Sequence, residues 1–463
     1  MSFFEKISSW ARRSITLKLI TIGILILILL IPSSMLTSLI YERETTRDNA
    51  TNEVSSKWGD SQTIGGPVIS IPYQSYIKTE DGKTESTTQY AHFLPNDLEI
   101  KGTIVPEKRY RGIYVVVLYN SQIEIKGKFS GPDFKLLNIS PEALQLNKAI
   151  ISLGITDMKG IKEQINFVTK DSSYSFSPGI VTNDIFNSGV SAPIDLTITK
   201  GIIEFSLKLD VNGSQKIYFL PFGKETNVEI SSTWNNPSFE GDFLPDERKV
   251  EAEGFSAKWK ILHLNRNYPQ QGLGSFINKE HSADHIDYDN YYYKGSIRES
   301  AFGVRLLLPV DEYQKTNRSA KYNVMFIIIT FITFFFVEVL NKKRLHPIQY
   351  LLVGFSICLF YVLLLSLSEH ISFDFSYLIS SIIILILITF YSKSILKSNF
   401  LTGLVGMILF ILYGFFYSLL QMQDYALLLG SAGLLIILAT IMYLTRKIDW
   451  YSLSSDKEEE NNT

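Results

Sequence analysis

The sequence has a single cysteine, Cys358, among 463 residues, and it lies in a long apolar run. One cysteine excludes a disulfide framework within the chain. A thiol in apolar surroundings is a poor nucleophile, so a catalytic cysteine is not expected. The formal net charge is −2, and this balance argues against a nucleic-acid binder, which would carry a basic patch or stripe.

The common sequence signatures of catalysis and nucleotide binding are also missing. The chain has no Walker A motif, no nucleophile-elbow serine and no glycine-rich phosphate loop between a strand and a helix. His281 and His285 are four residues apart, but no glutamate follows the first, so they do not form the zinc-protease pattern. Their Asp-, Asn- and Tyr-rich surroundings are typical of an exposed loop. We therefore expect no cofactor, no metal site and no enzymatic activity.

What the chain has in abundance is long apolar stretches. A membrane-spanning helix needs about 20 predominantly apolar residues, and six segments meet or approach that length. They are Leu17–Ile40, Tyr322–Leu340, Tyr350–Ser368, Phe375–Tyr391, Phe400–Leu420 and Tyr425–Leu444. The first is too long for a signal peptide and has no A-x-A-like cleavage site after it, which favours an uncleaved signal anchor.

Basic residues in the short loops predict the orientation of the spans. The N-terminus and the loops after the second, fourth and sixth spans carry Lys or Arg, whereas the alternate loops carry none. By the positive-inside rule, both termini are cytoplasmic. The predicted organisation is a cytoplasmic N-terminus (1–16), a signal anchor (17–40), an outer domain (41–321), a five-helix transmembrane domain (322–444) and a cytoplasmic tail (445–463).

The segment 41–321 is predicted to be rich in β-strands. In 203–211, apolar and polar residues alternate strictly, and 122–129 shows the same period of two, which indicates half-buried strands. Asn212 and Gly213, between two strand-like runs, predict a hairpin. Further strands are expected at 68–72, 113–119, 149–155, 227–231 and 304–309. A pair of sheets and a barrel-like sandwich both fit this pattern.

Candidate functional residues fall into two groups. One is in the outer domain, and the other is at the borders of the predicted spans. The segment 234–245 is dense in turn-forming residues between aromatics, which is typical either of a structural turn or of an interaction loop. Its candidates are Trp234, Asn235, Asn236, Phe239 and Asp242.

Ionisable residues border the third predicted span on both sides. Arg344 and His346 precede it and Glu369 and His370 follow it. A helix over Tyr350–Ser368 is about 28 Å long, so the two pairs cannot share one site. Asp424 is expected at the same face as Glu369 and His370. These three residues form a polar border, a packing contact with the outer domain or a site of proton chemistry.

Glu338, within the second span, is expected to reach the cytoplasmic interface and pair with Lys342, four residues on. No span has a charge near its centre, which argues against a proton-coupled transporter.

Several stretches together resemble one protein family. They are GGPVISIPY (65–73), WNNPSFEGDFLP (234–245), RLHPIQYLLVGFSICLFYVLLLSLSEH (344–370), DYALLLGS (424–431) and TRKIDWY (445–451). In this order they resemble the CreD family of bacterial inner membrane proteins, also called cell envelope integrity proteins. The resemblance covers nearly the whole chain and is weakest over about 262–300.

The resemblance implies a role in envelope integrity and in the response to envelope stress, with no established reaction and no catalytic residues to transfer. The fold class expected is six transmembrane helices with a large β-rich periplasmic domain between the first and second. Three functions remain open: a non-enzymatic protein that contacts periplasmic envelope proteins or cell-wall components, a transporter or flippase-like protein for a lipid or envelope precursor, and a membrane enzyme at the outer interface.

Overall fold

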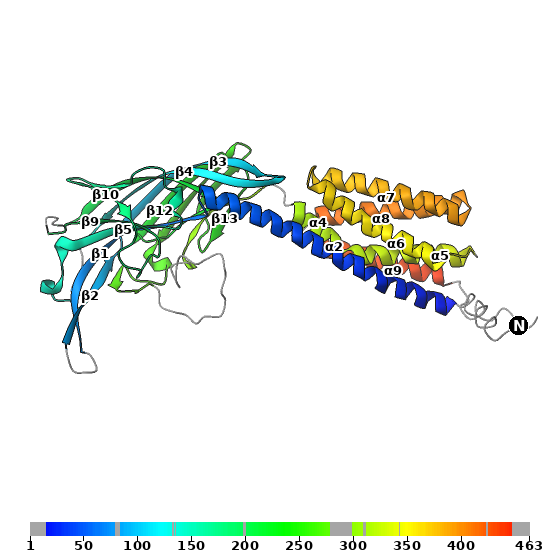
Figure 1. Cartoon of the computed structure of the whole chain (residues 1–463), viewed down its shortest axis with the longest axis horizontal. Coiled ribbons are helices and arrows are strands. Elements are labelled where there is room, and N and C mark those ends of the chain that lie inside the picture. Colours follow the sequence, from blue (N-terminus) through cyan, green and yellow to red (C-terminus); the bar gives the residue numbers. More distant parts are fainter. Residues whose placement is uncertain are drawn as a thin grey trace, which may run out of the picture. The chain divides into compact units, whose positions relative to one another are not determined.

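The computed structural model describes residues 15–78, 84–131, 134, 136–197, 201–277, 299–308, 312–341, 343–422 and 425–446. The chain divides into two compact units (Figure 1). We call Met1–Thr46 with Val310–Thr463 the helical unit, and Arg47–Pro309 the β domain.

All six predicted spans are helices. They are α2 (Ile15–Trp58), α5 (Asn323–Leu340), α6 (Pro347–Ser368), α7 (Phe373–Leu396), α8 (Asn399–Gln421) and α9 (Ala426–Thr445), and a short α4 (Glu312–Lys321) precedes α5. The first five are long and apolar enough to cross a bilayer, and α9 contributes the shorter apolar stretch Leu427–Tyr443. The chain is thus a multi-pass membrane protein with a bilayer as its environment.

Helix α2 ends at Trp58, well beyond the predicted boundary at Ile40. Residues 41–58 are polar but contain no proline or glycine, so nothing stops the helix when its apolar stretch ends. Helix α2 ends before Gly59, which has φ +148°. The Cα of Gly59 lies close to the backbone of Asn212, and an added Cβ would sit 2.7 Å from the Asn212 carbonyl oxygen.

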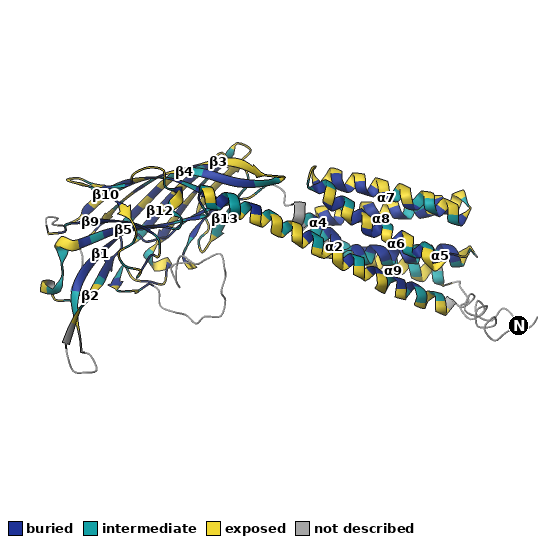
Figure 2. Ribbon diagram, viewed as in Figure 1, coloured by how far each residue is buried: buried dark blue, intermediate teal, exposed yellow. Residues whose placement is uncertain are grey.

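Helix α7 shows how the helical unit meets lipid. Its exposed large residues recur at intervals of about one turn on one side, and its buried residues lie on the other (Figure 2). The exposed set includes Leu378, Ile382, Ile386 and Phe390, and the buried set includes Tyr377, Ser381, Ile384 and Ile388. The exposed apolar side of α7 is the side expected to contact the acyl chains of the bilayer.

The β domain contains two sheets. In strand order, the nine-stranded sheet has β13 (Pro237–Gly241), β17 (Phe302–Leu306), β11 (Lys216–Phe219), β1 (Gln62–Lys78), β5 (Ala149–Ile155), β9 (Gly189–Ile194) and β8 (Ser177–Pro178), with β2 (Thr84–Phe93) pairing β1 and β16 (Gln271–Leu273) pairing β2. The eight-stranded sheet has β14 (Glu247–Glu251), β15 (Gly254–Leu262), β12 (Glu225–Ser232), β3 (Asp97–Arg111), β4 (Tyr114–Phe129), β10 (Ile203–Ser214), β6 (Asn166–Thr169) and β7 (Ser173–Ser175).

One hydrophobic core joins side chains of both sheets, so the pair of sheets is the arrangement adopted. Every predicted strand is present at least in part. The pattern in 203–211 is typical: Phe205, Leu207 and Leu209 are buried, and the polar residues between them are not. Alternation of this kind buries one face of a strand and leaves the other to solvent.

The hairpin predicted at Asn212 and Gly213 is wrong. Both residues lie inside β10, and the chain turns only at Gln215, which has φ 60°. The next strand, β11, then joins the other sheet, beside β1 and β17. Gly213 is a glycine for a different reason, since its Cα lies directly against the ring of the fully buried Tyr119. A packing glycine and a turn glycine look alike in a sequence.

Candidate functional site

The segment 234–245 is anchored to the β domain by its aromatic residues. Trp234 is buried and its Nε1–H donates to the Leu307 carbonyl, 2.9 Å away. Phe239 lies in β13, an edge strand paired with β17, and its ring packs edge-on against Phe255 and Trp259. The segment is therefore part strand, where the sequence predicted turns, and its aromatic side chains serve the core.

The polar candidates of the same segment lie at its surface. Asn235 is exposed, and Asn236 accepts from the Leu307 N–H through its carbonyl at 3.1 Å. Asp242 is exposed and its own N–H donates to the Ala301 carbonyl at 3.0 Å. These contacts hold the segment to the end of β17.

Glu369 and His370 occupy the turn between α6 and α7. Glu369 is mostly buried, and its Oε1 lies 3.8 Å from Nε of Arg43 on α2. His370 is exposed. Asp424 lies outside the described residues. A further acidic group at this end of the helices is Asp374, whose Oδ1 accepts from Tyr417 (3.1 Å) and Gln421 (2.6 Å).

Arg344 and His346 lie in the turn between α5 and α6, and both are exposed. His346 is the N-cap of α6: its Nδ1 accepts from the Ile348 N–H at 3.3 Å, and Gln349 Oε1 accepts from the His346 N–H at 2.9 Å. Pro347 fills the first helical position, where its missing N–H costs nothing. The Arg-Leu-His-Pro stretch thus starts a helix.

Glu338 is the polar centre of this end of the helical unit. Its side chain is 1% exposed, and one oxygen accepts from the Leu345 N–H at 2.7 Å while the other accepts from the Tyr350 hydroxyl at 2.9 Å. It also pairs with Lys18 of α2. One carboxylate therefore ties together α2, α5, the following turn and α6.

The prediction that Glu338 reaches the interface is wrong. The carboxylate is buried among its three partners, and the expected partner Lys342 lies outside the described residues. The cause is tertiary: Lys18 is 320 residues away in the chain, a separation that no local spacing rule can detect.

The β domain also contains a row of hydrogen-bonded Ser, His and Asp side chains, the Ser–His–Asp line, that no sequence motif indicated. Ser70 on β1 and His92 on β2 face each other across the sheet, with Ser70 Oγ 2.8 Å from His92 Nδ1. His92 Nε2 lies 3.0 Å from Asp184 Oδ2, and this hydrogen bond holds the pKa of Asp184 below its usual value. Ser70 and His92 are only 3% and 1% exposed, so the line ties a loop to the sheet and offers no open nucleophile.

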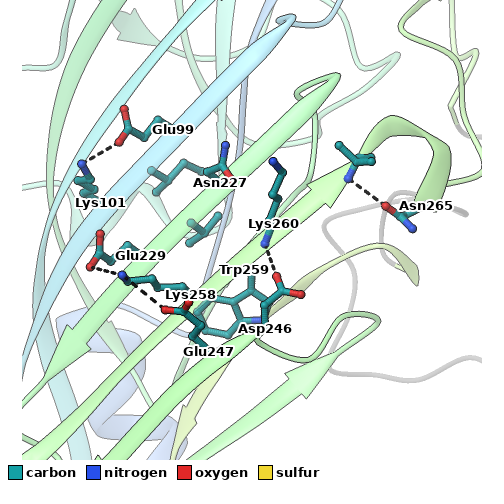
Figure 3. A pocket seen from close by; sticks show the side chains of 13 residues that line it. Glu99, Lys101, Asn227, Glu229, Asp246, Glu247, Lys258, Trp259, Lys260 and Asn265 are labelled. Carbon is teal, nitrogen blue, oxygen red and sulfur yellow. Dashed lines mark hydrogen bonds and ion pairs between the residues drawn. The ribbon is translucent and has the colours of Figure 1, made fainter.

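The outward face of the eight-stranded sheet carries two shallow grooves lined by charges of both signs. Figure 3 shows the first, of 470 Å³. There Lys258 lies between Glu229 (3.8 Å) and Glu247 (3.7 Å), and Lys101 pairs with Glu99 at 2.7 Å. The second groove, of 790 Å³, shares Glu99 and Asn227 with the first. We call the two together the charged sheet face.

The charged sheet face carries acidic and basic residues in similar number. Five of its six lysines have a carboxylate neighbour, so the face has no large field of one sign. Exposed pairs of this kind contribute about 0–1 kcal/mol each, and a partner can exchange them at small cost.

Within the described ranges, no group of three or more His, Cys, Asp or Glu residues is arranged to hold a metal ion. His281 and His285 lie outside those ranges.

Comparison with known proteins identifies the family. A family model described as inner membrane protein CreD matches residues 14–451. The chain is 32% identical over 436 residues to the inner membrane protein CreD of Escherichia coli (strain K12), which covers 93% of each chain. The chain belongs to the CreD family. The resemblance carried by the five sequence stretches is thereby confirmed, and nothing in the family description assigns a reaction.

Proposed function

We propose that the protein supports the integrity of the bacterial cell envelope and its response to envelope stress, without catalysis, through contacts made by its β domain. The observation that carries this proposal is the charged sheet face, a broad polar surface with shallow grooves. Such a surface suits periplasmic envelope proteins or polar cell-wall components. The burial of Ser70 and His92 supports the non-catalytic part.

The proposed orientation places both termini in the cytoplasm and the β domain in the periplasm. It is supported by the turns of the helical unit: Lys397 and Arg344 lie at one set of helix ends, and Glu369 and Asp374 at the other. Reporter fusions after Lys397 and after Ser372 test it. A reporter active only in the periplasm is expected to be active after Ser372 and inactive after Lys397, and the reverse pattern would refute the orientation.

The experiment for the function is complementation of a deletion strain under detergent and cell-wall-antibiotic stress. Lys258→Glu places a third carboxylate between Glu229 and Glu247 and should abolish complementation. Lys148→Glu makes the same charge change at an exposed position away from the grooves and should complement. Equal membrane levels of both variants are required. Full complementation by Lys258→Glu at normal levels would remove the charged sheet face from the function.

A transporter or flippase-like protein is the second candidate. It is favoured by polar side chains buried among the membrane helices α5, α6, α7 and α8, since a solute path needs a polar interior. Substrate flux in proteoliposomes that contain the purified protein would support it, and no flux across a broad panel of lipids and envelope precursors would count against it.

A further inference from the structure

Three tyrosines from three helices meet inside the helical unit. Tyr361 of α6, Tyr377 of α7 and Tyr413 of α8 are all buried. They surround the ring of Phe360, whose centroid lies 4.8 Å, 5.4 Å and 5.0 Å from theirs. The Tyr377 hydroxyl donates to the Tyr413 carbonyl at 2.9 Å. A membrane helix bundle therefore has a polar cluster in its centre.

The cluster continues toward α5 and α2. Cys358 precedes Tyr361 by one helical turn and lies beside Asn323 and Ser33. Asn323 is 1% exposed, and its Nδ2–H donates to Ser33 Oγ at 2.8 Å. We call the line from Ser33 through Asn323, Cys358 and Tyr361 to Tyr377 and Tyr413 the polar seam.

At its other end the polar seam approaches the surface. The Tyr417 ring lies 5.3 Å from that of Tyr377, and its hydroxyl donates to Asp374. Asp374 and Gln421 are exposed. Polar side chains are thus continuous from the end of the bundle where α7 begins to the interior at Asn323.

Two buried polar atoms of the polar seam, Oδ1 of Asn323 and Oη of Tyr413, have no hydrogen-bond partner among the described residues. On two of the helices that carry the seam, Ser380 Oγ of α7 and Thr330 Oγ1 of α5 also have none. Burying a polar group without a hydrogen bond costs roughly 1–3 kcal/mol. Four such atoms would be a substantial cost within one bundle.

These hydroxyls do not use the usual solution for serine and threonine in a helix. Ser392 and Thr402 each donate to the carbonyl four residues earlier in their own helices, which satisfies a hydroxyl without outside help. Ser380 and Thr330 do not, although both are completely buried. They remain available to another hydrogen-bonding molecule.

We propose that the polar seam is a hydrated site that binds ordered water inside the helical unit, entered from the end where α7 begins. A buried water needs two to four polar partners, and within the seam the unpartnered Asn323 Oδ1 and Tyr413 Oη each offer one. The seam contains no carboxylate, lysine or arginine, so an ion would find no counter-charge, whereas water and other uncharged hydroxyl-bearing groups fit its donors and acceptors. The proposal does not rest on the proposed function of the β domain.

The test is radiolytic hydroxyl labelling of the full-length protein in lipid nanodiscs, read residue by residue by mass spectrometry. Bound water generates radicals that label the adjacent side chain. Tyr350 is the internal control, because it is an equally buried tyrosine whose hydroxyl is taken by Glu338. We expect Tyr413 and Tyr361 to be labelled at least about threefold faster than Tyr350, because they contact water that Tyr350 does not.

A variant pair sharpens the result. Tyr413→Phe removes one unpartnered oxygen and should slow labelling at Tyr361, whereas Tyr350→Phe should leave it unchanged. Labelling of Tyr413 and Tyr361 at the rate of Tyr350 in the wild-type protein would show that the polar seam is dry and would overturn the proposal, whether or not the variants fold.

Discussion

Removal of the Glu338 carboxylate should be among the most destabilising single changes in the helical unit. Glu338→Ala leaves the Tyr350 hydroxyl and the Leu345 N–H without their acceptor and frees Lys18. Each buried donor left unsatisfied costs about 1–3 kcal/mol. Lys18 is 30% exposed and can turn to solvent, so its share is small. The expected loss is about 3–5 kcal/mol, the range for breaking a buried ion pair by removing one partner.

The native cysteine provides the assay. Cys358 is buried, and it is the single cysteine of the chain, so a fluorogenic maleimide reports unfolding of the helical unit during a thermal ramp in detergent. At about 2–4 °C per kcal/mol for a unit of this size, Glu338→Ala should melt about 6–20 °C below wild type. Glu338→Gln keeps one acceptor and should fall in between.

The matched control is Glu369→Ala. Glu369 also lies near the C-terminal end of an apolar helix and also faces a basic residue of α2, but Arg43 is 46% exposed, so the expected change is within about 1 kcal/mol. A melting point for Glu338→Ala within about 2 °C of wild type would mean a loss below 1 kcal/mol. The reasoning that treats Glu338 as a buried hub would then be wrong.

Two predictions concern the β domain and use denaturant unfolding followed by tryptophan fluorescence. The folded state lowers the pKa of Asp184, so the stabilisation from its charged form is present above its unfolded pKa and is lost as pH falls through the folded value. Asp184→Asn should therefore be about 1 kcal/mol less stable than wild type at pH 7. This difference in stability should shrink below about pH 4. A difference that is constant from pH 7 to pH 3 would contradict this. Gly213→Ala would place a Cβ 2.9 Å from Cε2 of the buried Tyr119 and should cost about 1–3 kcal/mol. Gly131→Ala, where the nearest atom is 3.9 Å away, is its control, and equal stability of the two variants would refute the packing argument.

Much of the fold could be predicted from the sequence, because the membrane helices and the longer strands are encoded locally. Hydropathy located α5 and α6 to within a few residues, and a period of two located β10 and the second half of β4. Local patterns could not show where α2 ends, since residues 41–58 have a helical composition but no apolar face to mark their role. They also could not show that the chain changes sheets after β10, because Gly213 is required by the distant Tyr119 and not by a turn.

The candidate residues show the same division between local and distant causes. Trp234 and Phe239 pack into the core of the β domain, which agrees with the structural alternative that the sequence left open for their segment. Glu338 was assigned to the wrong environment because the cations nearest to it in the sequence begin four residues later at Lys342, whereas the residue that pairs with it begins the first span. A carboxylate at the end of an apolar helix can be solvated by the interface or by a partner from another helix, and the two cases have the same local sequence. What separates the two cases is a basic residue on a different span at the same depth in the membrane. Lys18 lies near the start of α2, and Glu338 lies near the end of α5. Matching the depths of charged residues on different spans, and not spacing along one helix, is therefore the signal that finds such a pair.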